Sequence, residues 1–388
     1  MKLSNGELGS SGAISKEKVQ KLRQERPNYT EETLCLFRVH HVLADGVSMS
    51  VALGDASDEA DELQGNMLQQ IHERSEKMTQ RSFLQILIAT FQKYILFFAF
   101  GSIRALAHQF WRMMTSSNPF DEILARSSIP AGRRSTSWRD AASVDEVKKI
   151  AKALDPRGAT VNDVFVSCVT AAVERQLMQH HKQLNASRQT QNNDSSSSSS
   201  NNKGNNVTIP SYINVVVPVH LNGGVLLPGQ SLGNKIGGFV SQVPAKMSPP
   251  KGQATSTDRL RQVSASLRSG KSTPAPFISW IMAKFCSDYL PETVAQTAIL
   301  KGNAKAVAVI SNVRGFPFRV HWMGRPVESL CAFLPLPPGI PIGVVIQSYA
   351  GELSLSIDAD VRAVPDADCF AGWMMEEYAR LRTEAAGL

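Results

Sequence analysis

The spacing of apolar residues along the chain predicts strands and helices in no regular order. Short apolar or alternating runs predict strands at residues 32–41, 135–141, 212–219, 236–243, 306–311, 327–333, 342–347 and 353–357. Three- and four-residue spacing predicts helices at residues 46–54, from Ser143, from Thr160, and at residues 255–267, 277–290 and 366–383. Since these elements lack the rhythm of strand–helix–strand units, the pattern favours an α+β fold.

Residues 81–114 are the most apolar stretch of the chain, with large side chains at helical spacing. A membrane-spanning helix needs about 20 apolar residues in succession, and the pair Gln92–Lys93 interrupts this run. Three interpretations stay open. The stretch lies in the membrane interface with Arg104, Trp111 and Arg112 near the headgroups, it spans the membrane, or it is a buried core helix.

Two segments are too polar to bury a core of their own. Residues 1–31 are predicted to be a disordered, polar N-terminus. Residues 185–206 contain a run of serines flanked by asparagine and glutamine. We expect this second segment to be a disordered surface insertion without a catalytic role.

The composition limits the class of protein. With 388 residues, 43% of them hydrophobic, the chain can form one large or two medium domains. The net charge of +7 comes without a long basic run, which argues against a nucleic-acid partner and suits CoA phosphates or anionic headgroups. The five scattered cysteines argue against a disulfide framework or a zinc site, and we expect buried free thiols.

The clearest chemical signal is the stretch His40–Gly46, which has the pattern HHxxxDG and follows a predicted strand. A histidine at the end of a strand can be held rigidly, and its usual pKa lets it take a proton from a hydroxyl near neutral pH. Asp45 and Gly46 are expected to form the turn that fixes its pose, because glycine tolerates unusual backbone angles. The alternative is a pair of structural histidines beside an ordinary turn.

Further blocks follow this motif along the chain. They are TVNDV at residues 160–164, VPVHL at 217–221 with LGN at 232–234, SNVRG at 311–315 and SYAG at 348–351. In content and order, they and HHVLADG resemble the wax ester synthase/diacylglycerol acyltransferase family of the CoA-dependent acyltransferase superfamily. Arg314 stands where that family usually has proline.

The resemblance implies a two-lobed, chloramphenicol acetyltransferase-like architecture with a tunnel between the lobes. It divides the chain into the polar N-terminus at 1–31, the remainder of an N-terminal lobe at 32–158, and a C-terminal lobe at 159–388. Members of the family usually carry a longer segment before the HHxxxDG motif. The N-terminal lobe is therefore expected to be incomplete in this chain.

The resemblance also implies an activity. The protein would be an O-acyltransferase that moves a fatty acyl group from acyl-CoA to a long-chain alcohol, to diacylglycerol, or to both. His41 would be the general base, His40 would support it, and Asp45 would orient the loop. No cofactor is implied, because acyl-CoA is a substrate.

Other polar residues in the blocks are candidates for binding substrate or supporting the site. The tetrahedral intermediate needs a hydrogen-bond donor at its oxyanion, and Asn162 and Asn312 could supply one. Each also has a structural interpretation, at a helix start or at a strand exit. Asp163 has the spacing to Thr160 of a helix-capping pair, and Gly233–Asn234 fits a structural turn.

Two alternatives to this enzyme remain. One is another enzyme of the superfamily, such as a peptide-synthetase condensation domain, although no carrier-protein segment is visible in the sequence. The other is a catalytically inactive lipid-surface or scaffold protein derived from the same family. For the acyltransferase, the expected place is an intracellular membrane surface: the endoplasmic reticulum, the plasma membrane or a lipid droplet.

Overall fold

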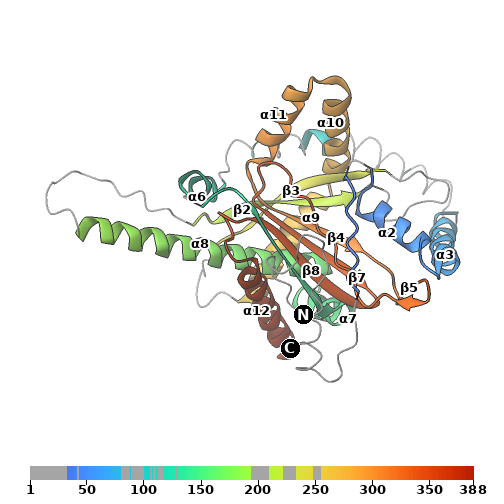
Figure 1. Cartoon of the computed structure of the whole chain (residues 1–388). Coiled ribbons are helices and arrows are strands. Elements are labelled where there is room, and N and C mark those ends of the chain that lie inside the picture. The colour runs from blue at the N-terminus through green and yellow to red at the C-terminus, as the bar shows by residue number, and fades with distance from the viewer. Residues whose placement is uncertain are drawn as a thin grey trace.

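In a computed structural model of the protein, the fold is built on a six-stranded mixed sheet (Figure 1). The structure describes residues 33–41, 43–79, 88, 100–104, 107, 111, 118–127, 129–193, 209–221, 233–247 and 255–388. The strands are β1 (Arg133–Ser143), β2 (Tyr212–His220), β3 (Ile236–Pro244), β4 (Ala306–Arg314), β7 (Ile342–Tyr349) and β8 (Glu352–Asp360). A separate two-stranded hairpin joins β5 (His321–Trp322) to β6 (Arg325–Pro326).

The strand order is β1-β8-β7-β4-β2-β3. The central strands β2, β4 and β7 run parallel to one another, and the outer pairs are antiparallel. The sequence explains the central position of β4 and β7, because both are nearly continuous runs of valine, isoleucine and alanine and are buried along most of their length. The predicted α+β class, with a mixed sheet, is confirmed.

Helices pack on the sheet and on one another. They are α2 (Gly46–Asp55), α3 (Ala60–Thr79), α6 (Asp121–Arg126), α7 (Val144–Leu154), α8 (Val161–Asn193), α9 (Ser256–Lys271), α10 (Ala275–Tyr289), α11 (Glu292–Asn303) and α12 (Ala367–Ala386). α8 packs against α7, α9 and α12, and α9 and α10 pack against β3. The main core lies between these helices and the sheet, around Phe165, Phe239 and Phe370.

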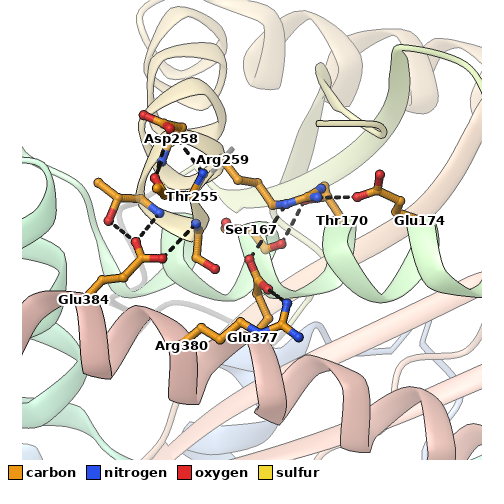
Figure 2. Close-up of polar contacts among 11 residues, drawn as sticks. Ser167, Thr170, Glu174, Thr255, Asp258, Arg259, Glu377, Arg380 and Glu384 are labelled. Carbon is orange, nitrogen blue, oxygen red and sulfur yellow. Dashed lines mark hydrogen bonds and ion pairs between the residues drawn. The ribbon is translucent and has the colours of Figure 1, made fainter. Parts of the chain in front are cut away.

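A buried polar cluster links three of the helices (Figure 2). Arg259 of α9 is only 5% exposed and binds Glu174 of α8, while its Nε lies 3.8 Å from Glu377 of α12. Glu384 of α12 accepts hydrogen bonds from the first amides of α9. Buried charges need such partners, so we assign this cluster a structural role in fixing α8, α9 and α12.

Most predicted elements are present with small shifts of their ends. β1, β2, β3, β4, β7 and β8 each cover a predicted strand, and α2, α7, α8, α9, α10 and α12 each cover a predicted helix. Thr160 and Asp163 form the predicted reciprocal cap, with Thr160 N–H bound to Asp163 Oδ2 at 2.9 Å. β1 belongs to the segment 32–158, which we assigned to the N-terminal lobe. It pairs with β8 and therefore lies in the same sheet as the strands of the segment 159–388.

Two predicted strands are wrong. Residues 33–40 have no regular structure, and the apolar side chains of Leu34, Leu36 and Phe37 are exposed. Residues 327–333 are also irregular. An apolar run becomes a strand only where a neighbouring strand accepts its backbone hydrogen bonds, and no described strand pairs with either segment.

The predicted insertion and the predicted thiols also need correction. Residues 185–193, placed in a disordered loop, are the last part of helix α8, while 194–206 lie outside the described residues. Cys168 is buried as expected, but Cys35 and Cys369 are exposed. Helix α11 was not predicted.

Residues 1–31 and most of 81–114 lie outside the described residues, so the three interpretations of the apolar stretch stay open. No helix in the described part of the chain has the length and hydropathy needed to cross a membrane.

Candidate active site

The HHxxxDG motif and the VPVHL, SNVRG and SYAG blocks come together at one edge of the sheet. Because β2, β4 and β7 are parallel, their carboxyl ends lie at the same edge. β2 ends at His220, β4 at Arg314 and β7 at Tyr349, so each of the three blocks ends here. Helix α2, which continues the motif, contacts β4 (Figure 1). Binding sites often form at this edge of sheets with parallel strands.

Gly46, the first residue of α2, packs against the end of β4. A Cβ at Gly46 would lie 3.2 Å from Cγ2 of Val313, which is tighter than most side-chain contacts. Its φ is not positive. The prediction that this glycine provides an unusual turn angle is therefore wrong, and its function is to let α2 approach the sheet.

Asp45 joins two segments that lie 190 residues apart in the sequence. Its side chain is fully buried. Oδ1 accepts the N–H of Ser48 at 2.8 Å and so caps α2, while Oδ2 accepts the N–H of Lys235 at 2.9 Å. The N–H of Asp45 and the hydroxyl of Ser48 both donate to the carbonyl oxygen of Gly233. One buried carboxylate therefore holds the motif against residues 233–235.

His41 lies at the surface of this assembly and is half-buried. Nδ2 of Asn234 lies 3.2 Å from Nδ1 of His41 and donates a second hydrogen bond to the carbonyl oxygen of His41 at 3.3 Å. Because an amide nitrogen donates, Nδ1 is the acceptor, and the neutral ring then carries its hydrogen on Nε2. Asn234 thus fixes both the position and the tautomer of His41. His40 is exposed, and its carbonyl oxygen accepts the N–H of Leu43 at 2.9 Å.

His220 approaches Asp45 from the end of β2. Its Nε2 lies 3.7 Å from Oδ2 of Asp45, and its side chain is 6% exposed. Burial lowers the pKa of His220, because the charged ring would lose its hydration. The Asp45 carboxylate opposes this shift, and the positive charge of Lys235 adds to it.

The SNVRG and SYAG blocks are in direct contact with each other. The N–H of Gly315 donates to the Ser348 hydroxyl at 3.3 Å, and a Cβ at Gly315 would lie 2.2 Å from the carbonyl oxygen of Ser348. The phenol of Tyr349 accepts the N–H of Val320 at 3.0 Å and donates to the carbonyl oxygen of Val327 at 2.6 Å. These contacts give the glycine of SNVRG and the tyrosine of SYAG structural functions.

The turn that follows α2 is hydrogen-bonded to the hairpin of β5 and β6. Asp58 accepts hydrogen bonds from the backbone N–H groups of Met323 and Gly324. Glu59 accepts one from the backbone N–H of His321 at 2.8 Å and a second from its ring Nδ1 at 2.7 Å. The hydrogen bond from the His321 N–H lowers the pKa of Glu59. Helix α2 is therefore held at both ends, which fixes the motif at its start.

The remaining candidates are not joined to the motif. Asp163 caps α8 and binds Nζ of Lys271 at 3.2 Å. Asn162 is buried, and its Oδ1 has no hydrogen-bond partner among the described residues. Asn312 is exposed one residue before Val313. No hydrogen bond or ion pair links these three side chains to the described residues of the motif, so their assignment as oxyanion donors stays a prediction.

Sequence reasoning missed Ser48, His220 and Lys235 as parts of the site. Ser48 has a local signal, because it stands three residues after a capping aspartate at a helix start. His220 stands in the VPVHL block, but nothing in that block points to Asp45, and Lys235 has no local signal. Their neighbour Asp45 is far away in the sequence, and only the folded sheet brings them together. Among the described residues, no group of three or more His, Cys, Asp or Glu side chains could hold a metal ion.

Residues 232–382 match the family model of the WS/DGAT C-terminal domain. This match confirms the predicted family resemblance for that part of the chain, which includes the LGN, SNVRG and SYAG blocks. The HHxxxDG motif lies outside the matched residues.

Solved structures show weaker similarity. The wax ester synthase/diacylglycerol acyltransferase from Marinobacter aquaeolei VT8 is 18% identical, with a TM-score of 0.42, over 70% of this chain and 55% of that one. The EpoB cyclization-docking bidomain from Sorangium cellulosum is 11% identical, with a TM-score of 0.46, over 95% and 67%. The PapA2 acyl transferase is 12% identical, with a TM-score of 0.36, over 71% and 55%. No curated protein sequence matches the chain.

This chain spans about half the length of the Marinobacter enzyme, because the alignment covers 55% of it. At these identities and TM-scores, no residue role can be carried over from the solved structures to this chain. The roles of its residues are therefore argued from its own geometry.

Proposed function

We propose that the protein is an O-acyltransferase that transfers a fatty acyl group from acyl-CoA to a long-chain alcohol, to diacylglycerol, or to both. The observation that carries this proposal is the position of His41. Its half-buried ring is fixed by Asn234 of the LGN block, where several blocks of the wax ester synthase/diacylglycerol acyltransferase type converge. The family match of residues 232–382 supports the same chemistry.

In the proposed reaction, His41 is the general base. An alcohol is a weak nucleophile until its proton is removed, and a well-placed base typically accelerates such attack about 10²–10⁴-fold. The acceptor hydroxyl takes the place of the Asn234 amide at Nδ1 of His41 and gives its proton to that nitrogen, while Asn234 keeps its hydrogen bond to the carbonyl oxygen of His41 and so holds the residue in place. The alcohol oxygen bonds to the thioester carbon, the carbon–sulfur bond breaks, and the proton passes from His41 to the CoA thiolate.

Asp45 and Gly46 act in this proposal by position and do not touch the substrate. Asp45 holds the motif against residues 233–235, and Gly46 lets α2 pack on β4. A base that is held in position removes the hydroxyl proton more effectively, because little free energy is then needed to orient it. His40 supports the turn through its carbonyl group.

A lipid surface is the partner that these substrates imply, and we propose that the protein works at an intracellular membrane or lipid droplet. Helices α10 and α11 contain no buried residue and expose large apolar side chains. Those of α10 are Phe277, Ile281, Met282, Phe285 and Tyr289. Such an exposed apolar surface suits contact with lipid.

The direct test measures ester formation by His41→Ala with labelled palmitoyl-CoA and either hexadecanol or diacylglycerol. We expect at least a 100-fold loss of turnover with an unchanged melting temperature, because His41 supplies the base and is not buried in the core. The matched control is His72→Ala, which removes an exposed histidine of α3.

Equal turnover by the His41 variant would remove the mechanism. If the unaltered protein formed no ester with either acceptor, the activity itself would be refuted, and the lipid-surface or scaffold interpretation would replace it.

A further inference from the structure

We propose that His220 is a positioning residue for His41 and acts through the Asp45 carboxylate. The proposal rests on the acyltransferase function above and adds a residue that neither the motif nor the family blocks single out as functional. It follows from three neighbouring contacts, which connect His220 to Asp45, Asp45 to residues 233–235, and Asn234 to His41.

The first contact is between two buried side chains. Oδ2 of Asp45 has no exposure to water and faces Nε2 of His220 at 3.7 Å. This distance is too long for a hydrogen bond, but in a buried place the dipole of the imidazole ring still interacts with the carboxylate. His220 is the last residue of β2 and pairs with Ile236 of β3, so the sheet fixes its ring.

The second contact is the hydrogen bond from the N–H of Lys235 to the same Oδ2, at 2.9 Å. The ring of His220 and the amide of Lys235 therefore approach one oxygen from two sides. If the ring were removed, the carboxylate could move away from the amide. The pairing of Asp45 with residues 233–235 would then loosen.

The third contact is the Asn234 amide on His41. Asn234 stands between Gly233 and Lys235, both of which are bound to Asp45 or Ser48. A shift of this segment moves Asn234 and hence the ring of His41. Because small displacements of a base can reduce turnover up to about 100-fold, an effect of His220 on catalysis is expected without contact to substrate.

The test is a double-mutant cycle in the full chain, with His220→Leu, Asp45→Ala and both together. We expect His220→Leu to lower kcat about 10- to 100-fold and to change KM for palmitoyl-CoA less than about 2-fold. His220→Gln should recover most of the loss, because its amide nitrogen lies where Nε2 of the histidine was and can donate toward Oδ2. In the Asp45→Ala background, His220→Leu should cause no further loss, since the group through which it acts is missing.

Amide hydrogen exchange gives a readout that does not need activity. We expect the amide of Lys235 to exchange about 10-fold faster in His220→Leu and at the normal rate in His220→Gln. The control is His180→Asn, which removes another buried histidine whose Nε2 lies 2.9 Å from the carbonyl oxygen of Ala363. It should leave the exchange at Lys235 unchanged.

Additive losses of kcat in the cycle, or unchanged exchange at Lys235 in His220→Leu, would overturn the proposal. If the unaltered protein formed no ester, the acyltransferase function would fail, but the exchange experiment would still decide whether His220 positions this segment.

Discussion

At the scale of the residue, the site depends on the hydrogen-bond and charge partners of one buried carboxylate, that of Asp45. A buried charge costs several kcal/mol unless it is paired and hydrogen-bonded. Asp45 meets this requirement with one amide from each of two segments and with the ring of His220. The same contacts that stabilise Asp45 therefore determine where His41 lies.

The lowered pKa of His220 predicts how stability depends on pH. Burial lowers the pKa of His220 in the folded protein, and Lys235 adds to this shift although Asp45 opposes it, whereas the unfolded chain binds a proton near the usual histidine pKa of about 6.5. As pH falls below about 6.5, the unfolded state takes up more protons than the folded state, so the free energy of unfolding decreases.

This dependence is measured by urea unfolding at several pH values between 5 and 7.5. His220→Asn should lose less stability than the unaltered protein as pH falls through this window, because it lacks the titrating ring. An identical pH dependence of the two proteins would show that His220 does not titrate differently in the folded and unfolded states.

At the scale of the element, helix α8 combines a packed half and a projecting half. Its first turns carry the cap of Thr160 and Asp163 and pack under the sheet, where Phe165, Val169 and Leu177 are buried. Its end at Asn193 extends beyond the other elements (Figure 1). The polar sequence of this end was enough to exclude it from the core, but not to exclude a helix, since glutamine, alanine and arginine all favour helices.

Replacing residues 185–206 with a short glycine–serine linker should leave both the melting temperature and turnover nearly unchanged. The deletion removes the projecting end of α8 together with the polar run that follows it. The helical part that is removed, about nine residues, is about 14 Å long, so the linker does not have to span this length. Thermal unfolding and the ester assay check this result. A loss of turnover above about tenfold would show that the segment acts at the site.

At the scale of the whole molecule, an exposed apolar surface is attached to the strand that follows the segment holding His41. Helix α10 is fastened to the start of β3, where the hydroxyl of Ser279 accepts the N–H of Gly238 at 2.7 Å. Gly238 is only four residues from Asn234, which holds His41. α10 and α11 then project from the sheet (Figure 1). Strand β3 therefore connects the surface proposed to bind lipid with the segment that positions the base.

A single acidic substitution in this surface should weaken binding to lipid. Phe285→Asp places a charge on the exposed face of α10, whose desolvation at a lipid interface costs about 2–3 kcal/mol or more. We expect at least a 10-fold lower partition onto phosphatidylcholine vesicles containing diacylglycerol, measured by flotation. Turnover of a water-soluble, short-chain acyl donor and acceptor should stay the same.

The control for this experiment is Ser287→Asp, which adds the same charge at an exposed polar position of the same helix. It should float like the unaltered protein. Equal flotation of Phe285→Asp would exclude α10 as the lipid-binding surface.

The sequence by itself determined the elements whose side chains carry a local pattern. Valine-rich runs predicted β2, β4 and β7, the Thr160–Asp163 spacing predicted the cap of α8, and HHxxxDG predicted a helix start at Gly46 with Asp45 at the turn. These features depend on neighbours a few residues away, so they can be recognised without a fold.

Only the tertiary structure decided how these parts meet. The apolar run before His40 has no neighbouring strand among the described residues and stays irregular, although its pattern favours a strand. The pairing of Asp45 with Lys235 and His220 requires the antiparallel pairing of β2 with β3, which places the end of β2 beside the start of β3, and the packing of α2 on β4, the other neighbour of β2. Such contacts depend on sheet order and burial, and these arise from the whole chain, not from any local segment.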